Sequence, residues 1–272
     1  MQTWEIVFTK KDTAELLKGE TGELGAKDVL VKLVYSTISS GTERANLTGE
    51  VNVSIYSVDK EAHFPRRLGY CSSGVVVEVG SDVRSVVPGD RVALSWGTHS
   101  QYKILNEKEV HKIESDNVDF QDAALALIAT FPLSAIRKCS LEIGEAALVM
   151  GQGILGQIAV KLLRAAGAVP VIAVDPVPRK RERALEIGAD YALDPFDPEF
   201  VKKAKTLSHG GVNVAIEVTG LGQGLDQALD VMAPMGRVAL LGCTRRSDFT
   251  IDYYHKVHGP GIQLFGAHTQ AR

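Results

Sequence analysis

Short apolar stretches separated by turns dominate the first half of the chain. Hydrophobic residues fill most of 29–35 and 73–79, and the turn Pro88-Gly89-Asp90 leads into a further apolar stretch at 91–94. Proline fixes φ at the first corner of such a turn, and glycine tolerates positive φ at the next. The pattern predicts short strands and a β-rich, barrel-like unit over residues 1–138.

The second half, residues 139–272, has a different periodicity. From about residue 121 the apolar residues fall at helical spacing, and from residue 146 strand, glycine turn, helix and strand alternate. This alternation predicts an α/β fold with a parallel sheet and crossover helices. A doubly wound dinucleotide-binding sheet uses six strands, and six candidates are found at 146–150, 170–174, 191–193, 213–218, 237–242 and 262–265.

A Gly-x-Gly-x-x-Gly pattern, Gly151, Gly153 and Gly156, lies between the first of these strands and the helical stretch 157–166. The first glycine would permit a tight turn, the second a close approach of the backbone to a pyrophosphate, and the third close packing of helix on strand. Free N–H groups at a helix N-terminus favour negative charge, so Ile154 and Leu155 are also predicted to bind the cofactor. A glycine turn that only packs a helix on a strand is the alternative.

Asp175 closes the second strand of the sheet, about 20 residues after the last glycine, where a carboxylate can accept hydrogen bonds from the adenosine ribose. A 2′-phosphate there would meet like charge, so Asp175 favours NAD over NADP. The following cluster, 179–183, is basic. Arg179 and Lys180 could pair with a 2′-phosphate or lie over the adenine, whereas a solvated helix face is the simpler interpretation. We expect NAD, with NADP as the alternative.

Composition and charge narrow the class of partner. The chain has 272 residues, of which 45% are hydrophobic and 23% charged, so a sizeable core can be buried. Its net charge of −3 speaks against a general nucleic-acid binder. The longest uncharged run, 146–160, contains glycines and is too short to span a bilayer, and three distant cysteines make no disulfide framework. We expect a cytoplasmic protein that acts on a small molecule, without nucleic acid or membrane.

Several motifs together resemble those of the medium-chain dehydrogenase/reductase superfamily, whose zinc-containing alcohol dehydrogenases are the familiar members. Besides the glycine pattern, they are the segments 68–80, 87–92, 186–190, 215–220 and 236–242. The resemblance covers essentially the whole chain. It implies an N-terminal GroES-like β-barrel domain, a Rossmann domain and an active site in the cleft between them. It also implies that Thr219 and Gly242 bind the cofactor, and that Glu217 and Gly220 shape the backbone there.

The chain departs from the family pattern at the metal. Where the zinc enzymes carry a cysteine ligand, residues 36–43 contain no cysteine, and the family's Gly-His-Glu is replaced by Gly69-Tyr70-Cys71. The third ligand region, 127–130, offers no Cys, Asp or Glu, and the four-cysteine structural lobe is missing. A catalytic zinc needs three nitrogen, sulfur or carboxylate ligands, so we expect no zinc. A site made of Cys71 with His63 or His99 is the alternative.

Without a Lewis acid, hydrogen-bond donors and a proton relay must stabilise the developing charge. The resemblance puts Thr42 where the zinc enzymes place the relay hydroxyl, and Tyr70 replaces a metal-binding histidine. Ser40 and Ser39 can line the site, and Glu43 can orient the loop. The alternative for each is a barrel residue that satisfies local backbone groups. The histidines are expected mostly on the surface or in turns.

The resemblance also bears on assembly and activity. In this superfamily the chain returns from the Rossmann sheet to complete the catalytic domain, and this return segment is expected to be absent here. Family members often pair the sixth strand, here 261–266, across a two-fold axis, so we expect a homodimer. The leading hypothesis is a zinc-independent NAD(P)(H)-dependent oxidoreductase that moves hydride between nicotinamide and an alcohol or carbonyl substrate. The alternatives are an enoyl or quinone reductase and a non-catalytic nucleotide-binding homologue.

Overall fold

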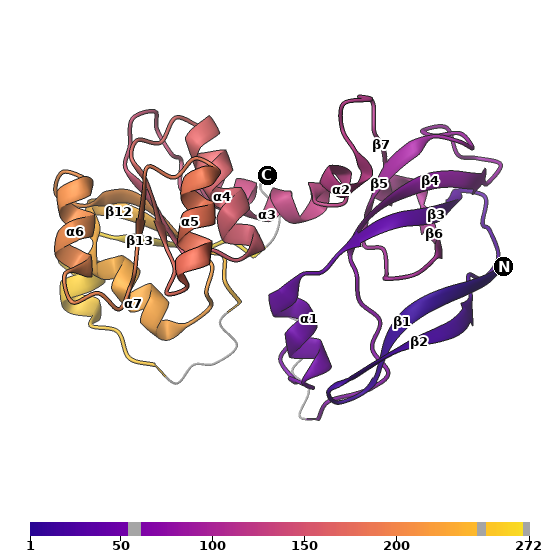
Figure 1. The fold of residues 1–272 in the computed structure, drawn as a ribbon, viewed down its shortest axis with the longest axis horizontal. Coiled ribbons are helices and arrows are strands. Elements are labelled where there is room, and N and C mark those ends of the chain that lie inside the picture. The colour runs from indigo at the N-terminus through magenta and orange to yellow at the C-terminus, as the bar shows by residue number, and fades with distance from the viewer. Residues whose placement is uncertain (54–60, 244–248, 269–272) are drawn as a thin grey trace. The chain divides into compact units, whose positions relative to one another are not determined.

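The structure is a computed structural model that describes residues 1–53, 61–243 and 249–268 (Figure 1). Its contacts divide the chain into two compact units, Met1–Ile128 and Ala129–Arg272. The α3 helix, Ala126–Lys138, runs through this division. Among the described residues, no helix is both long enough and apolar enough to cross a membrane.

The first unit is built mainly from antiparallel strands. Within its described residues, a hairpin of two strands accompanies a five-stranded sheet of order β6-β3-β4-β5-β7. Its elements are β1 (Gln2–Lys10), β2 (Thr13–Glu20), β3 (Asp28–Thr37), α1 (Ser40–Leu47), β4 (Cys71–Val79), β5 (Arg91–Ser95), β6 (Tyr102–Asn106), the 3₁₀ turn η1 (Glu107–Glu109), β7 (Val110–Lys112) and α2 (Phe120–Ala123).

Alternating valines and leucines make the core of this sheet. Val29 and Val31 of β3 are fully buried and pack with Val76 of β4 and with Val92 and Leu94 of β5. Because side chains of a strand alternate between its two faces, residues two apart share the buried face. The three strands expected at 29–35, 73–79 and 91–94 are confirmed, each with slightly wider bounds.

The helix α1 is not predicted by the sequence pattern, which indicates only short strands in this part of the unit. Its buried residues are Glu43, Ala45 and Asn46, so polar side chains occupy much of its inner face. An apolar stripe at helical spacing is the usual signal of a helix, and a helix buried through polar groups lacks that signal.

The second unit is a three-layer α/β structure with a six-stranded parallel sheet in its described residues, as expected for a Rossmann domain. The strand order is β10-β9-β8-β11-β12-β13. Its elements are β8 (Ala147–Met150), α4 (Ile154–Ala165), β9 (Val171–Val174), α5 (Pro178–Glu186), β10 (Tyr191–Leu193), α6 (Phe200–Leu207), β11 (Val212–Glu217), α7 (Gly222–Asp230), β12 (Met232–Leu240), the π-helical turn η2 (Tyr254–His258) and β13 (Gln263–Gly266).

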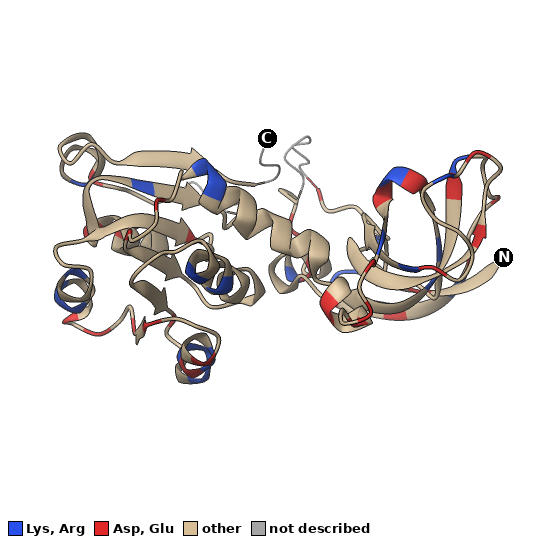
Figure 2. Cartoon of the chain, turned by 90° about the horizontal axis from the view of Figure 1, so that it is seen from above, with Lys and Arg blue, Asp and Glu red and all other residues tan. Residues whose placement is uncertain are grey.

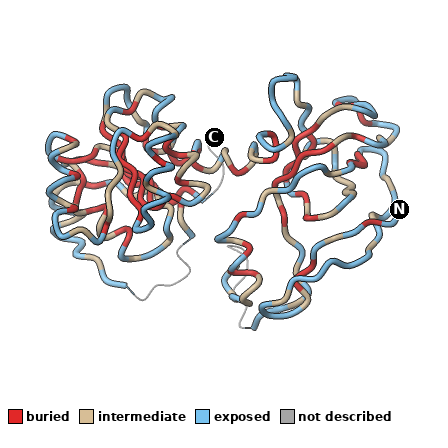
Figure 3. The backbone as a smooth tube through the Cα atoms, in the orientation of Figure 1, coloured by how far each residue is buried: buried red, intermediate tan, exposed pale blue. Residues whose placement is uncertain are grey.

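Each face of this sheet has its own core. Ala147 and Val149 of β8 pack with residues of α3, α4 and α5, whereas Leu148 and Met150 pack with residues of α6 and α7. The central strands are therefore buried on both faces. Figure 3 shows these strands as buried, and Figure 2 shows the charged residues mainly on helices and loops. This two-sided burial explains the continuous apolar runs of the sequence. The α4 helix begins at Ile154, earlier than the predicted start at residue 157.

Candidate functional site

In the second unit, a glycine turn joins the carboxyl end of β8 to α4. Gly151 has φ of +101°, a left-handed conformation that glycine adopts without strain. A Cβ atom on Gly156 would lie 1.9 Å from the carbonyl oxygen of Gly151. Residue 156 must therefore lack a side chain for the helix to start this close to the strand.

Gly153 has the opposite surroundings. It is the N-cap residue of α4, and among the described residues no atom lies within 4 Å of a Cβ built on it. The first-turn amides of a helix, which include those of Ile154 and Leu155, have no intrahelical acceptor. The turn thus presents open space in front of a set of N–H donors, an arrangement that fits a phosphate group.

Asp175 lies directly after β9, next to this turn. Its Oδ2 accepts a hydrogen bond from the Gln152 N–H at 2.8 Å, and its Oδ1 accepts one from the Val177 N–H at 2.9 Å. The residue is buried, with 4% of its surface exposed. Each carboxylate oxygen can accept more than one hydrogen bond, so the carboxylate can still accept bonds from ribose hydroxyls.

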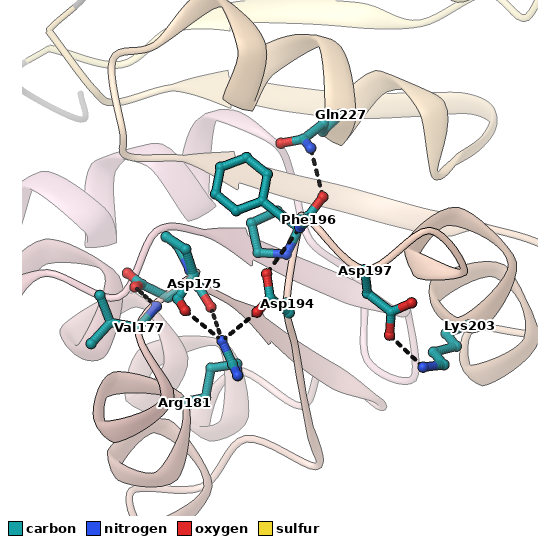
Figure 4. Close-up of polar contacts among 10 residues, drawn as sticks. Asp175, Val177, Arg181, Asp194, Phe196, Asp197, Lys203 and Gln227 are labelled. Carbon is teal, nitrogen blue, oxygen red and sulfur yellow. Dashed lines mark hydrogen bonds and ion pairs between the residues drawn. The ribbon is translucent and has the colours of Figure 1, made fainter.

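Two basic side chains of α5, Lys180 and Arg181, contact this aspartate, and Figure 4 shows the contact of Arg181. Lys180 places its Nζ 3.5 Å from Asp175 Oδ2, and both Lys180 and Arg179 are exposed. Arg181 instead donates to the backbone carbonyl of Asp175 at 2.7 Å and to Asp194 Oδ2 at 3.1 Å. Arg181 therefore joins the ends of β9 and β10, whereas Arg179 and Lys180 remain accessible to a ligand.

A third turn of this sheet edge follows β11. Glu217 accepts hydrogen bonds from the Thr219 amide at 2.7 Å, from the Thr219 hydroxyl, and from the Gly220 amide at 3.2 Å. Burial nevertheless raises the pKa of the Glu217 carboxyl. A Cβ on Gly242 would lie 2.2 Å from the Gly220 nitrogen. Glu217 and the two glycines thus fix the backbone here, and Thr219 reaches Gly151, where a Cβ would meet its Cγ2 at 2.9 Å.

In the first unit, sheet register brings two candidate catalytic segments together. The strands β3 and β4 are antiparallel with Thr37 opposite Cys71, so Ser39 and Tyr70 leave the sheet at the same end. The Tyr70 hydroxyl donates to Ser39 Oγ at 2.8 Å, and Ser39 Oγ lies 3.5 Å from Thr42 Oγ1 as a donor. We call Tyr70, Ser39 and Thr42 the hydroxyl chain. Ser40, the exposed first residue of α1, is not one of these linked hydroxyls.

A buried histidine lies beside the hydroxyl chain. The histidines are expected mostly on the surface or in turns, and His99, of which 7% is exposed, is an exception. Its Nε2 lies 3.0 Å from Glu43 Oε1, and its Nδ1 lies 2.8 Å from Ser36 Oγ. Glu43 Oε1 also accepts the Ser39 N–H at 3.1 Å. No local pattern marks these contacts, because they join residues 56 and 63 positions apart.

The donors near the hydroxyl chain do not fit a catalytic zinc. Zinc needs three nitrogen, thiolate or carboxylate ligands at one point, and no group of three or more His, Cys, Asp or Glu in the described part of the chain could hold a metal. Glu43 and His99 bond to each other, and Ser39 and Tyr70 do the same. Burial raises the pKa of the Cys71 thiol to about 12, so this thiol is protonated near neutral pH in the metal-free chain.

Two family models match the chain. The model described as alcohol dehydrogenase GroES-like domain matches residues 25–115, and the model described as zinc-binding dehydrogenase matches residues 155–270.

Curated relatives match along most of the chain. L-threonine 3-dehydrogenase of Pyrococcus horikoshii is 27% identical over 293 aligned positions, which cover 93% of this chain and 79% of the relative. D-guloside 3-dehydrogenase of Escherichia coli K12 is 29% identical over 256 positions, covering 86% of this chain and 72% of the relative.

Solved structures share the fold. A protein described as a zinc-binding dehydrogenase from Sinorhizobium meliloti, bound to NADP, superposes with a TM-score of 0.85 at 23% identity, covering 98% of this chain and 84% of the other. An alcohol dehydrogenase from E. coli CFT073, complexed with NADH, gives a TM-score of 0.83 at 20% identity and covers 98% and 83% of the two chains.

Proposed function

The chain belongs to the zinc-type alcohol dehydrogenase-like branch of the medium-chain dehydrogenase/reductase superfamily and is an NAD(P)-dependent oxidoreductase, and from this premise we propose that it works without zinc, on an alcohol or carbonyl group. The bound dinucleotide would supply or accept the hydride. The observation that carries the nucleotide site is the glycine turn after β8, with Gly151 at positive φ and Gly156 against its carbonyl oxygen.

In this proposal, the second unit holds the dinucleotide through its backbone. The pyrophosphate lies in the open space at Gly153, in front of the amides of Ile154 and Leu155. Thr219 and Gly242 belong to the same site, at the turns that follow β11 and β12.

We propose NAD as the preferred cofactor. The Asp175 carboxylate accepts hydrogen bonds from the ribose hydroxyls and repels a 2′-phosphate. Two exposed cations, Arg179 and Lys180, favour the phosphate instead, and Lys180 lies close enough to screen the carboxylate. Use of NADP is therefore the alternative at this site.

Proton transfer is assigned to the hydroxyl chain of the first unit. Thr42 accepts from Ser39, so its own hydroxyl hydrogen can be donated to a substrate oxygen, while Ser39 and Tyr70 polarise it from behind. Tyr70 can exchange its proton along the same chain. Ser40, exposed beside it, lines the site. These hydroxyl groups would stabilise the developing oxyanion as a metal does in the zinc enzymes.

The expected homodimer is also part of the proposal. The strand β13 lies at one end of the sheet as the structure describes it, and an edge strand carries backbone groups that a second copy can pair. Light scattering at several protein concentrations tests this association. We also propose that the protein is located in the cytoplasm.

Calorimetric titration with NAD, NADH, NADP and NADPH, combined with metal analysis of the same sample, tests the proposal. Preferential binding of NAD(H) without stoichiometric zinc is the expected result, and a screen of alcohols and carbonyl compounds then follows cofactor absorbance. Stoichiometric zinc would overturn the metal-free site. Turnover of conjugated alkenes or quinones alone would select the enoyl or quinone reductase, and nucleotide binding without any turnover would select a non-catalytic homologue.

A further inference from the structure

His99 combines deep burial with polar partners at both ring nitrogens. Its Nε2 contacts Glu43, which is 8% exposed, and its Nδ1 contacts Ser36. Removing a carboxylate and an imidazole from water carries a desolvation cost, and their mutual attraction offsets this cost only when the geometry is good. An apolar pair would fill the same space, so the stability of the fold does not by itself explain this pair.

Glu43 connects this pair to Ser39 of the hydroxyl chain. Its Oε1 accepts from both His99 Nε2 and the Ser39 amide, at 3.0 and 3.1 Å. Ser39 precedes α1 and its side chain makes no cap hydrogen bond to the helix. The Glu43 amide also donates to the Ser39 carbonyl at 2.9 Å, so Glu43 holds the Ser39 backbone at both its N–H and its C=O.

His99 itself contacts the segment that leads into Tyr70. Gly69 has φ of +107°, and a Cβ built on it would lie 2.5 Å from the His99 nitrogen and 2.7 Å from the imidazole Cγ. The His99 amide also donates to the Leu68 carbonyl at 2.8 Å. The residue thus packs on the peptide that immediately precedes Tyr70.

We propose that His99, acting through Glu43, is a positioning residue that holds Ser39 Oγ against the Tyr70 hydroxyl. The backbone and ring of His99 pack against Gly69, which precedes Tyr70. The His99 Nε2 holds the Glu43 carboxylate, and this carboxylate accepts the Ser39 N–H. The assignment rests on the proposed function in one respect, because the hydroxyl chain is the proton path of the proposed reaction.

The test is ¹³C NMR of the whole chain labelled at tyrosine Cζ, which reports the hydrogen bonding of each phenol. Tyr70→Phe assigns the Tyr70 resonance, and Ser39→Ala shows where this resonance moves when its acceptor is lost. We expect His99→Gln and Glu43→Ala to move it in the same direction as Ser39→Ala. A glutamine amide cannot reach Glu43 and Ser36 on opposite sides as the imidazole does. Glu43→Gln keeps an acceptor for the Ser39 amide, so it should move the resonance less than Glu43→Ala.

His255→Gln is the control, because His255 also pairs with a carboxylate, with Nδ1 2.8 Å from Asp252 Oδ2 in the second unit, and should leave the Tyr70 resonance unchanged. The other tyrosine resonances must stay in place in every variant of the first unit, which excludes general unfolding. An unmoved Tyr70 resonance in both His99→Gln and Glu43→Ala would overturn the assignment. Calorimetric NADH binding reports on the glycine turn instead, so failure of the proposed cofactor site is measured separately.

Discussion

The glycine turn of the second unit and the hydroxyl chain of the first unit are both proposed to place polar groups for a ligand, but by opposite means. The turn uses backbone amides, and its shape depends on residues that lack side chains, within six consecutive positions, 151–156. The hydroxyl chain uses side chains from segments 31 residues apart, held by a further pair 56 apart. A backbone site is therefore sensitive to any added atom, whereas a side-chain site is sensitive to loss of one partner.

Gly156→Ala should produce the largest effect and tests the backbone side of this comparison. The new Cβ would lie 1.9 Å from the Gly151 carbonyl oxygen, and backbone atoms cannot rotate away as a side chain can. We expect a loss of about 3 kcal/mol in unfolding free energy together with loss of NADH binding. Urea unfolding and calorimetry measure both.

Gly266→Ala serves as its control, because among the described residues no atom lies within 4 Å of that Cβ. Equal stability of Gly156→Ala and the wild type would mean that the turn opens without cost, and the backbone account of this site would then be wrong.

Tyr70→Phe tests the side-chain half of the comparison. The change removes one hydroxyl and leaves the ring in place, so the first donor of the hydroxyl chain is lost while packing is kept. We expect kcat to fall about 10²-fold with NADH affinity unchanged, measured on a substrate found by the screen. Tyr35→Phe, an exposed tyrosine of β3, is the control. Unchanged kcat in Tyr70→Phe would remove Tyr70 from the proton path.

The same contrast explains what could be read from the sequence. The six strands of the parallel sheet and the position of the glycine turn were predictable, since each depends on residues adjacent in the chain. The link between Tyr70 and Ser39 depends on the register that puts Thr37 opposite Cys71, which no local pattern specifies. The burial of His99 is not predictable from the sequence, because its partners Glu43 and Ser36 lie on distant segments. The roles of the candidate residues toward cofactor and substrate stay predictions.

Asp175→Asn sharpens the comparison, because this residue adds a side-chain carboxylate to a backbone site. An amide keeps one acceptor oxygen but loses the charge that repels a 2′-phosphate. We expect the Kd for NADH to rise about tenfold and the Kd for NADPH to fall, by calorimetry. Asp197→Asn, which affects an aspartate paired with Lys203 (Figure 4), is the control. Equal changes for the two cofactors would show that Asp175 does not discriminate between them.

Gly153→Ala separates folding from binding at the same turn. Its φ of −75° suits alanine, and the added Cβ meets no described atom within 4 Å, so stability should stay near the wild-type value. The methyl group would occupy space proposed for the pyrophosphate, and we expect the Kd for NADH to rise roughly tenfold. Unaltered NADH affinity would place the phosphates away from Gly153.

The smallest expected effect is a pH slope at Glu217, whose carboxyl is buried in a turn made largely of backbone. Burial raises its pKa in the folded protein above that of the unfolded chain, so the folded state favours the protonated form. The contribution of this group to stability is fully present below the unfolded pKa and is lost as pH rises through the folded pKa.

Glu217→Gln cannot titrate, and its neutral amide shifts stability by the same amount at every pH. The urea midpoint of Glu217→Gln, relative to the wild type, should therefore rise as pH increases from the ordinary carboxyl range. Glu182→Gln, which changes an exposed glutamate of α5, supplies the reference slope. If the urea midpoints of the wild type and Glu217→Gln change in parallel across this pH range, the pKa of Glu217 is not raised by folding. The hydrogen bonds from Thr219 and Gly220 would then compensate fully for the burial of the carboxylate.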